Sequence, residues 1–162
     1  MGELRYRSIH DLVIPLLKTD LNVKIWGKHW EGIGLFYPDM KVPKLMYQGI
    51  LPFQQTPRVF SSTKINISIQ TCKDQLSNRT LDILASGGFL LTSNTKAVRE
   101  KLRPGINCIA SNSPEETLDL VTYYLDHDNE RKLIAEHGRE LAVQQFDYTR
   151  TLQKIWYEIE TE

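Results

Sequence analysis

The sequence predicts an α/β fold: a Rossmann-like, doubly wound, mostly parallel sheet with helices on both faces. Two observations carry this prediction. Short apolar stretches typical of strands alternate along the chain with amphipathic stretches typical of helices, and parallel strands need such crossovers. The length of 162 residues suits one domain with a sizeable core. We therefore expect a single domain over residues 1–162, with the C-terminal helices packing across it.

The periodicity of apolar residues assigns each element in order. Alternating or continuous apolar runs predict strands at 21–27, 44–50, 64–70, 87–92 and 106–110. Helical spacing predicts helices at 8–17, 53–62, 78–87, 94–105, 113–125, 129–145 and 148–160. Ser8 is the expected N-cap of the first helix, and Pro15 predicts that this helix is kinked or short. A doubly wound domain normally begins with a strand, so we expect the first strand to be missing or to lie elsewhere.

Hydropathy and residue spacing argue against a membrane protein, a secreted protein and a metal site. No apolar run approaches the roughly 20 residues of a membrane span, and the first residues lack the apolar core of a signal peptide, so we expect a cytoplasmic protein. The cysteines and histidines match no metal spacing, which predicts no metal site.

Charge is unevenly distributed along a chain whose net charge is zero. Residues 1–110 hold 15 basic and 8 acidic residues, whereas residues 111–162 hold 5 and 12. The basic part suits an anion such as a nucleotide phosphate, although charges that merely decorate helices explain the distribution equally well. The chain lacks the clustered basic helix of a nucleic-acid binder, so no nucleic-acid partner is expected.

A polar face stands at the start of the segment SNRTLDILASGGFLLT, residues 77–92. On a helix that begins near Asn78, Arg79 and Asp82 lie opposite the apolar side chains. Backbone N–H groups at a helix start favour anions, Arg79 suits phosphate oxygens, and Asp82 suits a vicinal diol such as ribose. Asp74 lies eight positions before Asp82 and could flank the same ligand. A solvated ion pair between Arg79 and Asp82 is the plain alternative.

Four stretches together resemble one protein family. They read MYQGILPFQQTPRVFSSTKINISI, NRTLDILASGGFLLT, LRPGINCIASNSPEETLDLVTYYL and DNERKLIAEHGRELAVQQFDYTRTLQKIW, and they span residues 44–160. Their order resembles the carboxy-terminal domain of GT-B glycosyltransferases. Within that superfamily they are most similar to the spore-maturation glycosyltransferase-like proteins of the CgeB type.

This resemblance implies a site for a nucleotide-diphosphate sugar, which is a substrate, and it implies no cofactor. It places the ribose contact on Asp82, the donor-sugar contact on Asp74 and the diphosphate contact on Arg79. Both acids are aspartates where the superfamily has glutamates. The implied donor-binding residues are Gly49, Ile50, Leu51, Asp74, Ser77, Asn78, Arg79 and Asp82, with Arg5 and Arg7 as candidate phosphate contacts.

The resemblance also implies that the protein has a partner. GT-B enzymes have two such domains, and the acceptor site and usually the catalytic base belong to the amino-terminal one, which this sequence does not show. We therefore expect a donor-binding half that is inactive alone. The alternative is a non-catalytic module of the same fold, with a degenerate donor site, in spore-coat or surface-layer assembly. A receiver-like or flavodoxin-like domain is less consistent, because neither the acidic pair nor the Ser/Thr loop expected after a first strand is visible.

Overall fold

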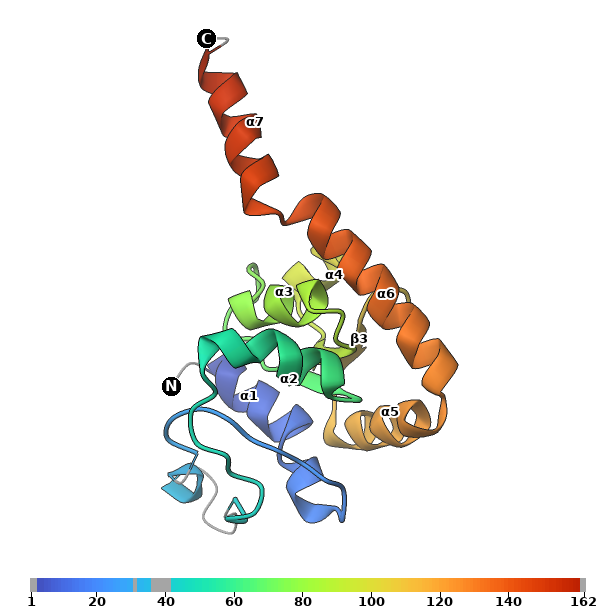
Figure 1. Cartoon of the computed structure of the whole chain (residues 1–162). Coiled ribbons are helices and arrows are strands. Elements are labelled where there is room, and N and C mark those ends of the chain that lie inside the picture. Colours follow the sequence, from blue (N-terminus) through green and yellow to red (C-terminus); the bar gives the residue numbers. More distant parts are fainter. Residues whose placement is uncertain (1–2, 31, 36–41, 161–162) are drawn as a thin grey trace.

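A computed structural model describes residues 3–30, 32–35 and 42–160 of the chain (Figure 1). Its sheet has three parallel strands in the order β1-β2-β3. The strands are β1 (Asn66–Ser68), β2 (Leu90–Ser93) and β3 (Ile109–Ser111). In the register, Asn66 lies beside Leu90, and Leu91 lies beside Ile109. The three predicted strands of this part of the chain are thus confirmed, although each is shorter than its apolar run.

Helices connect and cover the strands. They are α1 (Glu3–Leu12), α2 (Thr56–Ser62), α3 (Asn78–Ala85), α4 (Lys96–Lys101), α5 (Pro114–Asp126), α6 (Asp128–Gln145) and α7 (Tyr148–Glu160). Short 3₁₀ helices lie at Pro15–Lys18, Ile33–Leu35 and Phe53–Gln55. The helices expected from 53 onward are therefore confirmed in kind and in position, with the 53–62 stretch divided between a 3₁₀ turn and α2.

Two apolar cores lie on the two faces of the sheet, as a doubly wound fold requires. On one face, Phe89, Leu91 and Ile109 pack with side chains from α1 and α5. On the other face, Leu90 and Cys108 pack with side chains from α3, α4 and α6. Side chains alternate between the faces of a strand, so neighbouring residues of β2 serve different cores. The predicted layering, with helices on both faces, is confirmed.

The prediction for the first helix is wrong in two details. The helix begins at Glu3 rather than after Ser8, and Ser8 is a buried residue within α1. Its hydroxyl donates to the carbonyl oxygen of Gln70 at 3.0 Å, so it joins α1 to the sheet instead of capping a helix. Pro15 begins a separate 3₁₀ helix because a proline is tolerated in a first turn, where its missing N–H has no partner to lose.

The strands expected at 21–27 and 44–50 are reduced to one parallel bridge between Ile25 and Tyr47. The backbone N–H of Ile25 donates to Met46, and the N–H of Gly27 donates to Gly49. Gly27 and Gly49 have φ values of 131° and 74°, which L side chains rarely adopt, so the chain turns away at both and the pairing stops. No strand precedes α1 among the described residues.

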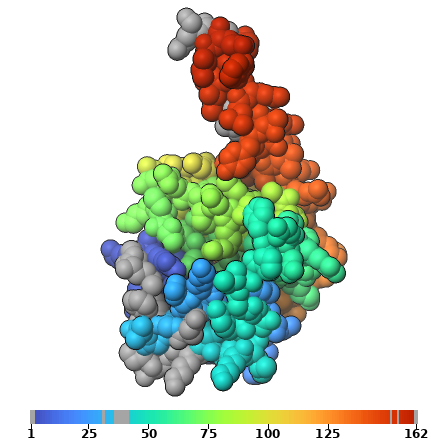
Figure 2. Space-filling model, turned by 60° about the vertical axis from the view of Figure 1, so that its left-hand side comes forward, coloured from blue at the N-terminus to red at the C-terminus, as the bar shows by residue number. Residues whose placement is uncertain are grey.

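The C-terminal helices differ in how they pack. Helix α6 packs against α3, which confirms the expected crossing of the domain. Helix α7 projects away from the body beyond the end of α6 (Figures 1 and 2). The packing expected of α7 is therefore not found. Over the described ranges, none of these helices is long and apolar enough to cross a membrane.

Candidate functional site

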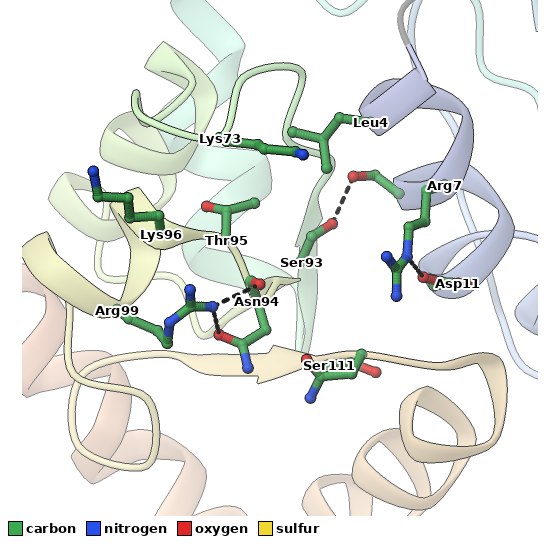
Figure 3. A pocket seen from close by; sticks show the side chains of 12 residues that line it. Leu4, Arg7, Asp11, Lys73, Ser93, Asn94, Thr95, Lys96, Arg99 and Ser111 are labelled. Atoms are coloured by element: carbon green, nitrogen blue, oxygen red, sulfur yellow. Dashed lines mark hydrogen bonds and ion pairs between the residues drawn. The ribbon is translucent and has the colours of Figure 1, made fainter.

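A cavity of about 360 Å³ opens at the carboxyl ends of β2 and β3 (Figure 3). Helix α1 supplies one wall, the strand ends supply the floor, and the loop after β1 together with α4 supplies the rest. Its lining residues are Leu4, Arg7, Ser8, Asp11, Lys73, Ser93, Asn94, Thr95, Lys96, Arg99, Ser111 and Asn112. Ligands of doubly wound sheets bind outside the carboxyl ends of the strands, so this is the expected place for a site.

Four basic side chains and one acid line this cavity, which makes it favourable for an anion. Arg7 from α1 forms an ion pair with Asp11 at 3.4 Å. Arg99 from α4 donates to the carbonyl oxygen and the side-chain oxygen of Asn94, at 3.1 and 3.0 Å, so its guanidinium is held at the end of β2. Figure 3 shows both guanidinium groups beside the strand ends.

The lysines of the cavity come from two different segments. Lys73 belongs to the loop after β1, and its carbonyl oxygen accepts a hydrogen bond from the N–H of Ala97. Lys96, at the start of α4, forms an exposed ion pair with Asp74 at 3.5 Å. These contacts join the loop to α4 and bring two more cations to the same edge of the sheet.

The N-termini of α4 and α5 are capped beside the cavity. The hydroxyl oxygen of Thr95 accepts from the N–H of Val98 and so caps α4. The hydroxyl oxygen of Ser113 accepts from the N–H of Glu116 at 3.2 Å, and the Glu116 carboxylate accepts from the N–H of Asn112 at 2.7 Å. The Ser-Pro-Glu-Glu stretch predicts a capping box at this position, and the structure confirms it.

A buried polar network fixes the loop that carries Lys73. Gln70 is fully buried, and its side-chain amide donates to the hydroxyls of Thr80 and Thr92, each at 2.8 Å. Its amide oxygen accepts from the N–H of Ser77 at 3.1 Å. The Ser77 hydroxyl in turn lies 3.0 Å from that of Ser68. Residues 71–77 are therefore anchored at both ends, and α3 starts from a fixed point.

Sequence reasoning missed this network and the cavity cations Lys73, Lys96 and Arg99. The available signal was the alternation over residues 65–70, in and just after β1, where Asn66, Ser68 and Gln70 follow the isoleucines. Polar residues at every second position normally indicate a solvated face of a strand. Here that face is covered by α3, whose Thr80 hydroxyl bonds to Ser68 and Gln70.

The residues predicted on α3 lie outside the cavity. Helix α3 does start at Asn78, and Arg79 and Asp82 share its exposed face, as the spacing predicts. Neither of them lines the cavity, nor do Ser77 and Asn78. Ser77 occupies the N-cap position, but its hydroxyl bonds to Ser68 in the buried network and does not cap α3. The donor contacts assigned to these residues stay predictions.

The other predicted residues divide between the cavity and the surface. Arg7 lines the cavity, whereas Arg5 is exposed and does not. Gly49, Ile50 and Leu51 follow the bridge at Tyr47, away from the cavity. Ile50 is exposed and Leu51 is half-buried. Among the residues that the structure describes, no group of three or more potential ligands could hold a metal ion.

A protein family described as "Glycosyl transferase-like" matches residues 7–156, nearly the whole chain. This chain belongs to the glycosyl transferase-like family. No curated protein matches it closely enough to be counted as a relative. This family match agrees with the resemblance to GT-B glycosyltransferases, but it does not confirm the assignment to the spore-maturation branch.

Solved structures share the fold at low sequence identity. The Anabaena protein Alr3699/HepE in complex with UDP has a TM-score of 0.78 at 13% identity, over 100% of this chain and 47% of that one. Sucrose-phosphate synthase from Thermosynechococcus elongatus has a TM-score of 0.75 at 11% identity, over 97% and 43%. A mutant of T4 phage BGT in complex with UDP-glucose has 0.72 at 16%, over 98% and 44%. The chain thus spans less than half the length of each.

Proposed function

We propose that this chain is the donor-binding half of a glycosyltransferase and that it binds a nucleotide-diphosphate sugar at the carboxyl edge of its sheet. The observation that carries the proposal is the cavity with four basic side chains at that edge, in a chain of the glycosyl transferase-like family. The fold supports it as well, since structurally similar proteins were solved with UDP or UDP-glucose.

In this proposal the diphosphate occupies the cavity. Arg7 and Arg99 contact its oxygens from opposite walls, and Lys73 adds charge from the loop. When the bond between sugar and diphosphate breaks, negative charge develops on the leaving diphosphate, and fixed cations stabilise that charge. These side chains can neutralise the diphosphate without a divalent metal. Asp82 remains the proposed ribose contact, since α3 begins directly after the loop that carries Lys73.

The acceptor and the catalytic base belong, in this proposal, to a second α/β half. The chain spans 43–47% of the solved proteins that it resembles, so a complete enzyme of that kind has room for another domain of similar size. The chain alone then binds donor but transfers sugar at no useful rate.

Calorimetry with UDP, uridine and UDP-glucose tests the proposal. We expect UDP and UDP-glucose to bind and uridine to bind more weakly. Removing a charged hydrogen-bond donor should cost about tenfold in affinity, so Arg7→Ala or Arg99→Ala should weaken UDP binding by about that factor and leave uridine nearly unchanged. The matched control is Arg58→Ala, which removes an exposed arginine of α2 away from the cavity.

Two results would count against the proposal. Folded protein that binds none of these nucleotides at millimolar concentration would favour the non-catalytic module instead. Equal weakening by Arg58→Ala and Arg7→Ala would mean that UDP responds to net charge rather than to the cavity. The ribose assignment has a separate test, because Asp82→Asn should reduce the preference for UDP over its 2′-deoxy analogue.

A further inference from the structure

Asp11 places a negative charge in the wall of a cavity that otherwise favours anions. Among the residues that the structure describes, it is the only carboxylate that lines the cavity, beside four basic side chains. Its charge lowers the attraction of the cavity for a phosphate. An acid at this position therefore needs an explanation, because an uncharged side chain of the same size would leave the cavity more positive.

The stability of the fold does not explain this acid. Asp11 is only 9% exposed, and burial of a charged carboxylate costs free energy unless its partners offset that cost. It also lies in the last turn of α1, where the helix dipole disfavours a negative charge. Both effects act against folding, so the explanation has to come from the contacts of the carboxylate.

The contacts of Asp11 hold two neighbouring side chains of α1. One carboxylate oxygen, Oδ2, forms an ion pair with Nε of Arg7 at 3.4 Å. The other, Oδ1, lies 2.8 Å from Nδ1 of His10, which is the donor because a carboxylate only accepts. Arg7 lies four residues before Asp11, which is the spacing at which side chains on one face of a helix meet.

Pairing through Nε leaves the outer edge of the Arg7 guanidinium available to a ligand. Its two terminal nitrogens carry N–H groups in the fork geometry that binds two phosphate oxygens at once. Figure 3 shows this guanidinium on the cavity side of α1, joined to Asp11 by a dashed line. The Arg7 side chain is 69% exposed, so without this ion pair it would be free to occupy many rotamers.

The part of α1 that carries both residues is fixed to the sheet. The Ser8 hydroxyl donates to the carbonyl oxygen of Gln70 at 3.0 Å and accepts from the Ser93 hydroxyl at 2.7 Å. These bonds join α1 to the carboxyl end of β2 and to the residues just after β1. The Asp11 carboxylate therefore has a fixed place beside the cavity, and it fixes the Arg7 guanidinium in turn.

The opposite wall of the cavity has a similar arrangement with an uncharged acceptor. Arg99 donates through one terminal nitrogen, Nη1, to the carbonyl oxygen and the side-chain oxygen of Asn94. Its other nitrogens remain available to a ligand. Each arginine of the cavity is thus held by an acceptor beside it, as expected of donors that are oriented before a ligand binds.

We propose that Asp11 is a positioning residue, which orients the Arg7 guanidinium for the diphosphate of the donor. This inference rests on the proposed function, because it concerns the same cavity. Ordering a long side chain on binding lowers affinity by about fivefold, and Asp11 provides that order in the free protein. The two donors that Asp11 binds partly neutralise its charge, so the gain in order exceeds the repulsion of the phosphate.

Replacing Asp11 with asparagine distinguishes positioning from a plain charge effect, because the two predict changes of opposite sign. If the acid acted only through its charge, Asp11→Asn would make the cavity more positive, and calorimetry would show tighter UDP binding. Positioning predicts that UDP binds about fivefold more weakly while uridine, which lacks phosphates, is unaffected. The matched control is Asp119→Asn, which removes an exposed carboxylate of α5 outside the cavity and should bind UDP like the wild type.

A double variant tests whether Asp11 acts through Arg7. In an Arg7→Ala background, Asp11→Asn should no longer weaken UDP binding, because the side chain that it orders is absent. A further fivefold loss in that background would overturn the inference. Equal or tighter UDP binding by Asp11→Asn alone would also overturn it, as would equal weakening of UDP and uridine, which indicates a general structural defect.

Nuclear magnetic resonance relaxation of the arginine Nε–H groups tests the inference without a nucleotide. The order parameter of the Arg7 Nε–H group should fall in Asp11→Asn, whereas that of Arg99 should not change. UDP binding by the wild type together with unchanged order at Arg7 would overturn the role of Asp11 alone. A folded wild type that binds no UDP would instead overturn the proposed function, and the inference with it.

Discussion

Replacing Gln70 with leucine removes three hydrogen bonds from the joint between β1 and α3. Two of them join the Gln70 amide to the hydroxyls of Thr80 and Thr92, and the third holds the N–H of Ser77. Thr80 and Thr92 keep other partners, since Thr80 also contacts Ser68 and Thr92 donates to the Ser68 carbonyl oxygen. Among the described residues the Ser77 N–H has no other hydrogen-bond partner, so it is the group that the substitution leaves unpaired.

The magnitude follows from these contacts. Each intramolecular hydrogen bond contributes about 1 kcal/mol net, and the unpaired N–H adds about 1 kcal/mol or more. The leucine side chain offsets part of this loss because it buries no polar group in the fully buried position of Gln70. We therefore expect Gln70→Leu to lower the free energy of unfolding by about 2–3 kcal/mol.

Urea denaturation measures this loss, and hydrogen exchange measures its location. The matched control is Gln75→Leu, the same substitution at an exposed position of the same loop, which should change the unfolding free energy by less than about 0.5 kcal/mol. The Ser77 amide should lose its exchange protection in Gln70→Leu and keep it in the control. Equal stability of the two variants, or unchanged protection at Ser77, would refute the role assigned to the network.

Two further predictions concern packing and thiol chemistry. In Gly138→Ala the new Cβ would lie 2.7 Å from the carbonyl oxygen of Asn107, so the unfolding free energy should fall by about 1–2 kcal/mol despite the better helix propensity of alanine. The control is Gly32→Ala, where the new Cβ has ordinary contact distances and the stability should stay near that of the wild type. A Gly138→Ala protein as stable in urea as the wild type would contradict the close approach. Burial raises the pKa of the Cys108 thiol to about 12, so a thiol reagent at pH 8 should modify Cys72 quickly and Cys108 only after unfolding. Rapid modification of both cysteines in the native protein would contradict the burial of Cys108.

Local features of the chain were predictable from sequence because their causes lie within a few residues. The apolar stripe along α7 follows from helical periodicity, and the start of α5 follows from the Ser-Pro-Glu-Glu capping signal. The exposed face shared by Arg79 and Asp82 follows from their spacing on one helix. The prediction of strands at 21–27 and 44–50 was wrong in extent because strand length depends on contacts outside the local sequence. Apolar alternation makes pairing possible, but its extent depends on a partner and on where the chain turns.

The sequence by itself determined the order of strands and helices, and hence a parallel α/β domain, since periodicity and caps act over one or two turns. Only the tertiary structure decided that Ser8 is a buried anchor, that the polar side of β1 lies beneath α3, and that Arg7, Lys73 and Arg99 meet at one edge of the sheet. Those contacts join segments distant in the sequence, and no local preference of a residue specifies which distant segment will cover it.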